Sequence, residues 1–194
     1  MFGADRRPGL LPYLMATAFL STFAGTTAAQ QARPIQVSLL TPVQIFPEED
    51  SIFGLRLNLL YGRNAAVTGL DSGLVNHTRV SGGAQVGIVG ITDARFVGWQ
   101  DNIVSVSRES LAGAQTGLVA IASQLQGLQG GAVTIGQSVE GFQYGLVNYA
   151  KAVRGFQLGL INYASTLKGL QVGLGNIIAE GGWLPFFPIF NFGL

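Results

Sequence analysis

Few residues of this chain are of the types that carry catalytic chemistry. Its 194 residues include one histidine, His77, and no cysteine. A metal cluster of histidines and cysteines and a Cys–His nucleophile pair are therefore excluded. Asp71 and Ser72 are near His77 in the sequence, but nothing in their spacing indicates a Ser–His–Asp site. We therefore predict that the chain is not an enzyme and has no catalytic residues.

The acidic residues form no recognisable metal site, and the glycines form no recognisable phosphate site. The one cluster is Glu48-Glu49-Asp50, which could bind a hard cation but is more typical of a solvated turn. The glycines recur without a lysine–serine pair and without a following helix, so they do not form a phosphate-binding loop. We expect no metal and no cofactor. The other acids of the central region are scattered along it: Asp71, Asp93, Asp101, Glu109 and Glu140.

The dominant feature of the chain is a repeat of 14 or 15 residues. Near the end the sequence reads GFQYGLVNYAKAVR, then GFQLGLINYASTLK, then GLQVGLGNIIAEGG. A fixed short period indicates one small structural unit that is stacked many times. We number the positions of each unit from its first residue, which we call the lead glycine. The lead glycines are Gly54, Gly69, Gly83, Gly98, Gly113, Gly127, Gly141, Gly155 and Gly169.

Amides recur at two positions of the repeat. Position 3 is Arg56 and Asp71 in the first two units and glutamine in the next seven, and position 8 is often asparagine. Parallel stacking of the units would bring like residues together and form ladders of hydrogen-bonded amides. We therefore predict a structural ladder of Gln85, Gln100, Gln115, Gln129, Gln143, Gln157 and Gln171, and of Asn148, Asn162 and Asn176.

Position 5 contains only glycine and asparagine, which tolerate a positive φ angle best. We predict a recurrent bend with positive φ there; the alternative is that a side chain from a neighbouring layer needs the space. Positions 2 and 6 are apolar and are expected to face a core, as is the apolar residue two before the next lead glycine. The position 5 residues are Asn58, Gly73, Gly87, Asn102, Gly117, Gly131, Gly145, Gly159 and Gly173.

The repeated region is predicted to be β. No unit has the apolar spacing of an amphipathic helix, and two glycines per unit would weaken one. The favoured fold is an all-β repeat protein, a β-solenoid of nine units of 14–15 residues stacked in parallel. The alternative is a small outer-membrane β-barrel or a curled β-meander with one strand per unit. Low charge fits a barrel, but its natural period would be a hairpin of about 28 residues.

Composition divides the chain into four parts. Residues 1–29 have the layout of a secretory signal peptide, with a basic start, an apolar run and small residues before Gln30. Residues 30–50 are predicted to form an extended N-terminal cap, and residues 51–178 the nine-unit repeat domain. Residues 179–194 are predicted to form a C-terminal cap rich in aromatic residues and proline.

The predicted mature chain is formally neutral. Cleavage would remove Arg6, Arg7 and Asp5 from the 11 basic and 10 acidic residues, which leaves nine of each. Neutrality argues against a nucleic-acid partner, which requires a basic face. Without cysteine there are no disulfides, so an exported chain would gain its stability from packing alone.

The units GFQLGLINYA and GLQVGLGNI, together with the ending WLPFFPIFNFGL, resemble the bacterial surface-repeat proteins built on tandem GLQxGLxN units. The resemblance covers the chain from about Arg33 to its end, and the early units depart from it at Asp71, Asp101 and Ser105. It implies an exported, envelope-associated protein and transfers no catalytic residue.

These observations predict a non-enzymatic structural or surface scaffold of a bacterial envelope. Its repetitive β surface would bind a protein or another envelope component, at the outer membrane, the cell surface or in the periplasm. One alternative is an outer-membrane β-barrel that acts as a pore or anchor. A weaker alternative is a β-solenoid that acts on envelope polysaccharide, which the scattered carboxylates do not favour.

Overall fold

A computed structural model describes residues 32–194, and in this part the chain is all-β. Its elements are β1 (Ala32–Leu40), β2 (Val43–Gln44), β3 (Ser51–Glu180) and β4 (Phe186–Gly193). Within these residues no helix is long and apolar enough to cross a membrane. The predicted signal peptide, residues 1–29, lies outside the described residues.

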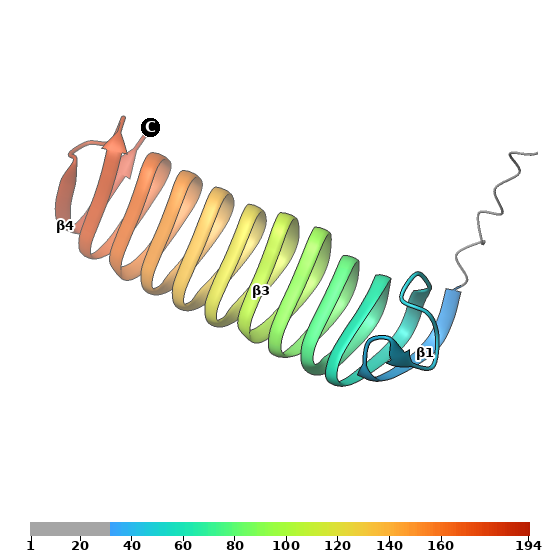
Figure 1. Cartoon of the computed structure of the whole chain (residues 1–194). Coiled ribbons are helices and arrows are strands. Elements are labelled where there is room, and N and C mark those ends of the chain that lie inside the picture. The colour runs from blue at the N-terminus through green and yellow to red at the C-terminus, as the bar shows by residue number, and fades with distance from the viewer. Residues whose placement is uncertain (1–31) are drawn as a thin grey trace, which may run out of the picture.

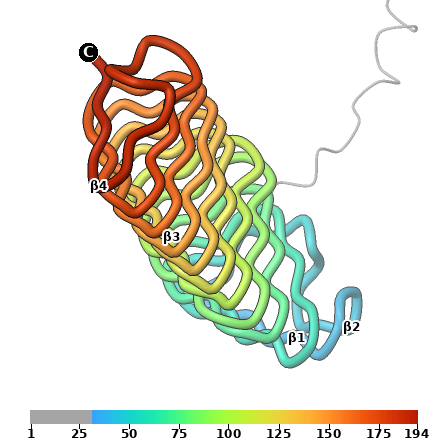
Figure 2. Tube along the Cα trace, turned by 90° about the vertical axis from the view of Figure 1, so that its left-hand side faces the viewer, coloured from blue at the N-terminus to red at the C-terminus, as the bar shows by residue number. Residues whose placement is uncertain are grey.

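The long element β3 winds as a succession of turns along one axis (Figure 1), and Figure 2 shows the same stack turned so that its C-terminal end faces the viewer. Equivalent residues of successive turns lie against each other. A β-carbon built on Gly155 would collide with the carbonyl oxygen of Gly141, and the same relation joins each lead glycine from Gly69 to Gly169 with the preceding one. Like residues therefore meet in parallel register at every layer of the stack.

The sheet is open, with the strand order β2-β1-β3-β4. The strand β1 pairs in parallel with the start of β3, and Gln36 lies opposite Arg56. Because the first and last strands do not pair and like residues stack in parallel, the alternative of a closed or meandering sheet with one antiparallel strand per unit is wrong.

Both ends of the stack are covered by short strands in the regions assigned to caps. At the N-terminal end, β2 pairs antiparallel with β1. At the C-terminal end, β4 turns back and pairs antiparallel with residues 169–177 of β3. The ring of Trp183 stacks on Phe190 and Phe192 there, with centroid distances of 6.0 and 5.4 Å. The short strands pair with backbone edges that would otherwise be open to other chains.

The interior of the stack is narrow and contains two kinds of residue. Position 3 is fully buried in every unit, as are most residues at positions 8 and 10. The apolar residue two before the next lead glycine is also buried, as the sequence predicts: Val67, Phe96, Leu111, Leu125, Val139, Val153 and Leu167. Amides and apolar side chains therefore share one core.

The prediction that positions 2 and 6 face the core is wrong. At position 6 the leucines and isoleucines have exposed fractions of 42–72%: Leu59, Leu74, Ile88, Ile103, Leu118, Leu146, Leu160 and Leu174. At position 2, Leu70 and Trp99 are exposed and the other residues are partly buried or exposed. The cause is strand alternation, because successive side chains point to opposite sides and position 3 points inward.

Candidate binding surface

The glutamines at position 3 form a continuous ladder through the core. From Gln100 to Gln171, each Nε2 donates to the Oε1 of the glutamine one layer earlier, at 2.7–2.8 Å. Several of these Nε2 groups also donate to a backbone carbonyl, as Gln115 does to Ile121 at 3.1 Å. All the ladder bonds point toward the N-terminal end, so the ladder has one direction.

A buried ion pair forms the start of this ladder. Arg56 donates from Nε and Nη2 to the two carboxylate oxygens of Asp71, both at 2.7 Å, and both side chains are at most 1% exposed. Gln85 donates its Nε2 to the same carboxylate at 2.9 Å. A carboxylate only accepts hydrogen bonds, so Asp71 accepts from Arg56 on one side and from Gln85 on the other. Gln85 must therefore donate toward Asp71, and each later glutamine donates in the same direction.

At both ends of the position 3 column, a side-chain amide forms hydrogen bonds with the backbone instead of with a further glutamine. At the first end, Gln36 donates to the carbonyl of Phe46 and accepts from its N–H, at 2.8 and 3.0 Å. At the last end, Asn191 lies opposite Gln171 and donates to the carbonyl of Leu184 at 2.7 Å. The Oε1 of Gln171 has no partner, as expected for the last acceptor of a one-way ladder.

The predicted asparagines form a second ladder, which runs in the opposite direction. Asn148 donates to Asn162, and Asn162 donates to Asn176, each at 2.8 Å and toward the C-terminal end. Thr134 donates its hydroxyl to Asn148 at 2.6 Å and so begins this ladder. The core is therefore held across layers by side-chain amides as well as by the backbone.

The prediction of positive φ at position 5 is wrong. The left-handed angles, from +100° to +144°, belong to the lead glycines. At position 5 only Gly117 has a positive φ, +159°, at the edge of extended backbone, and the others have none: Asn58, Gly73, Gly87, Asn102, Gly131, Gly145, Gly159 and Gly173.

Space inside the stack explains position 5 instead. A β-carbon on Gly159 would lie 2.5 Å from the Nδ2 of Asn148 and 2.6 Å from the carbonyl oxygen of Gly145. Where position 5 is asparagine, the nearby position is a glycine: a β-carbon on Gly90 would collide with the side chain of Asn102. Positions 5 and 8 therefore share space, and an asparagine at one of them, such as Asn148 or Asn102, requires a glycine at the other.

The structure gives His77 no hydrogen bond to Asp71 or Ser72, the residues near it in the sequence. His77 Nδ1 is 2.9 Å from the hydroxyl of Tyr61, and Nε2 is 2.9 Å from Asp93 Oδ2. Arg108 donates to the other oxygen of Asp93 at 2.9 Å. Asp71 is bound to Arg56, so no Ser–His–Asp site forms. This polar chain joins successive layers at the early end of the stack.

The acidic cluster is a turn held by ion pairs. Arg33 Nε lies 3.0 Å from Asp50, and Arg63 lies 4.0 Å from Glu48. Within residues 32–194, no group of three or more acids or histidines is arranged to hold a metal ion.

The outward side chains of positions 2, 4 and 6 form one surface along the stack, which we call the apolar face. Between Gly69 and Ile178 its only charged residue is Asp101, which is half-buried and accepts from the hydroxyl of Thr116 at 2.7 Å. Tyr144 and Leu158 of position 4 and Leu146 and Leu160 of position 6 border a shallow hollow of about 410 Å³. Its floor is the glycine backbone of position 5.

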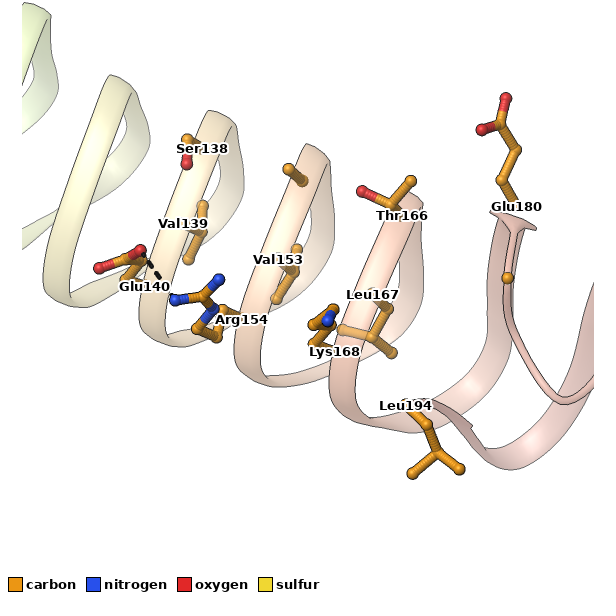
Figure 3. Close-up of a pocket in the computed structure, with 12 residues that line it drawn as sticks. Ser138, Val139, Glu140, Val153, Arg154, Thr166, Leu167, Lys168, Glu180 and Leu194 are labelled. Carbon is orange, nitrogen blue, oxygen red and sulfur yellow. Dashed lines mark ion pairs between the residues drawn. The ribbon is translucent and has the colours of Figure 1, made fainter.

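Charged residues gather on the other side of the stack, between position 11 and the next lead glycine, which we call the polar side. A groove of about 480 Å³ near the C-terminal end of this side is lined by hydroxyls, by charges of both signs and by apolar side chains (Figure 3). Arg154 is 3.7 Å from Glu140 there. The charged residues of this side between Gly69 and Ile178 are Arg79, Asp93, Arg95, Arg108, Glu109, Glu140, Lys151, Arg154 and Lys168.

The chain matches no family model, no curated protein and no solved structure.

Proposed function

We propose that this chain is a non-enzymatic structural protein, a nine-unit β-solenoid scaffold whose apolar face is a binding surface. The observation that carries the proposal is the separation of side chains around the stack. Leucine, isoleucine and aromatic residues follow one face through all nine units, while the exposed charges lie on the polar side. Monomeric proteins rarely expose a continuous apolar patch larger than a few hundred Å².

The core supports the scaffold part of the proposal. Its amide ladders and its ion pair tie each layer to the next, and every bond requires the layers to remain in register. A rigid stack keeps the columns of the apolar face straight, so a partner meets a surface that is already organised and loses less conformational freedom on binding.

The resemblance to bacterial surface-repeat proteins and the signal-peptide layout of residues 1–29 support the proposed location, the bacterial cell envelope. A catalytic role is not supported, because the hydroxyls of Ser138 and Thr166 in the groove on the polar side form no hydrogen bond with an acid or a base of residues 32–194.

Labelling of single cysteines in living cells tests this proposal. The chain has no cysteine, so Leu146→Cys reports on the apolar face and Thr166→Cys on the polar side, both at exposed positions. Ala150→Cys, at a fully buried position, controls for folding. A maleimide should label Thr166→Cys and leave both others unlabelled, since a partner covers the apolar face.

Two results would refute the proposal. Equal labelling of Leu146→Cys and Thr166→Cys, with Ala150→Cys protected, would show that the apolar face is free. A chain that keeps residues 1–29 and stays in the cytoplasm, as mass spectrometry of cell fractions would reveal, would refute the envelope location.

A further inference from the structure

We propose that the partner of the apolar face is the same face of a second copy of this chain. This inference rests on the proposed function and names its partner. Two faces would pack as the two sheets of a sandwich do, about 10 Å apart. The result is a closed dimer with a two-fold axis, in which each copy offers the same surface to the other.

The shape of the face favours a partner with the same spacing. Its outward residues stand in three columns, with one residue per layer and layers about 4.8 Å apart. Between the columns of positions 4 and 6, Leu146 and Leu160 border one side of the hollow over the glycines. Another copy has ridges of leucine with the same repeat distance, and such a ridge can enter this hollow along its length.

The area of the face is close to what a stable dimer needs. Nine layers give a length of about 40 Å, and five residues of strand give a width of about 17 Å. The footprint is therefore about 700 Å² per copy, against about 800 Å² in an interface of standard size. Exposed aromatic side chains, which are enriched in such interfaces, contribute to it at Trp99 and Tyr144.

A lipid surface fits the face less well, because of Asp101. Its carboxylate lies at position 4, in the middle column, and accepts from Thr116, which in turn accepts from the indole N–H of Trp99 at 3.2 Å. A carboxylate buried in the hydrocarbon of a bilayer is costly. In a protein interface this small network remains satisfied and can gain further donors from the second copy.

The basic residues also argue against a lipid partner. Surface-bound membrane proteins combine an apolar face with lysine and arginine that contact lipid headgroups. Here the exposed cations lie on the polar side, and Arg108 and Arg154 are already paired with Asp93 and Glu140.

Analytical ultracentrifugation of the protein purified from the expressing cell tests the inference. At about 1–100 μM the wild type should sediment with twice the mass of one chain. Leu146→Glu combined with Leu160→Glu should weaken the dimer at least about 100-fold, since each copy would then bury two unpaired carboxylates in the interface. Both leucines are at least half exposed. The matched control, Ser138→Glu combined with Thr166→Glu on the polar side, should remain dimeric.

Circular dichroism must show the wild-type β signal in each variant; if the glutamate pair unfolds, glutamine at the same two positions replaces it. A wild type that is monomeric over the whole range overturns the inference, as does a dimer that the face variants leave intact. Co-sedimentation of a monomeric wild type with phosphatidylcholine vesicles, lost in the face variants, assigns the face to lipid. That result overturns the proposal that the partner is a second copy, but it agrees with the proposal that the apolar face is a binding surface.

Discussion

Removal of one glutamine from the middle of the ladder should destabilise the protein strongly. Gln143 is fully buried, donates to Gln129 and accepts from Gln157, each at 2.8 Å. In Gln143→Ala the acceptor of Gln129 loses its ladder donor. The amide of Gln157 keeps only a long bond of 3.4 Å to the carbonyl of Tyr163. Two lost bonds contribute about 0.5–1.5 kcal/mol each, and a buried polar group left unpaired costs about 1–3 kcal/mol.

We therefore expect Gln143→Ala to lower the free energy of unfolding by about 2–6 kcal/mol. Gln171→Ala should cost less, because Gln171 donates to Gln157 but its own Oε1 has no partner. Gln137→Ala, at an exposed position, is the matched control and should change stability by less than about 0.5 kcal/mol. Urea unfolding followed by circular dichroism gives all three values. A change at Gln143 as small as that at Gln137 would refute the ladder as a source of stability.

Two further predictions concern the ion pair and position 5. Asp71→Asn should cost about 3–5 kcal/mol in urea unfolding, because it leaves the buried charge of Arg56 without its counter-ion. Glu140→Gln, which removes an exposed ion pair, should cost at most about 1 kcal/mol, and similar losses in the two variants would contradict this reasoning. Gly159→Asn and Gly159→Val should be about equally destabilised, since either β-carbon meets Asn148. The double variant Gly159→Asn with Asn148→Gly should lose less than the sum of its single changes; strict additivity would show that the two positions do not share space.

The period of the sequence predicts most of the backbone. A unit of 14 or 15 residues with two glycines and no helical spacing leads directly to a stack of β layers. The seven glutamines at position 3 lead to the ladder, because an amide can donate to one neighbour and accept from the other. The sequence also contains the signal for the role of Arg56 and Asp71 at the start of the ladder, since they occupy the same position of the repeat as the glutamines.

The side to which each position points could not be read from hydrophobicity. In a compact domain apolar residues lie inside, and that rule places positions 2 and 6 in the core. In this narrow stack the inside holds Gln143 and its equivalents, so the residues beside them in the strand must point outward. Strand alternation counted from the glutamines gives the observed arrangement of positions 2 to 6. Hydrophobicity inverts that part of the unit and is correct for the apolar residue two before the next lead glycine.

Position 5 shows a second limit of prediction from sequence, which arises when each position of the repeat is considered alone. Glycine and asparagine share a tolerance for positive φ, and that common property suggested a bend. The structure shows that they alternate for another reason: Asn102 fills space that Gly90 leaves empty in the layer before. Two columns, positions 5 and 8, had to be compared layer by layer to find this, because neither one alone contains the signal.

The direction of the two ladders gives the buried ion pair an electrostatic role. Amide dipoles aligned head to tail add up, as peptide dipoles do in a helix, and anions are stabilised at the end where the N–H groups point. The N–H groups of the glutamine ladder point toward Asp71, so the carboxylate lies at the positive end of that column. The asparagine ladder points the opposite way and offsets part of the same field. An acid at position 3 is therefore favourable only where the ladder begins; at Gln143 it would place two acceptors face to face.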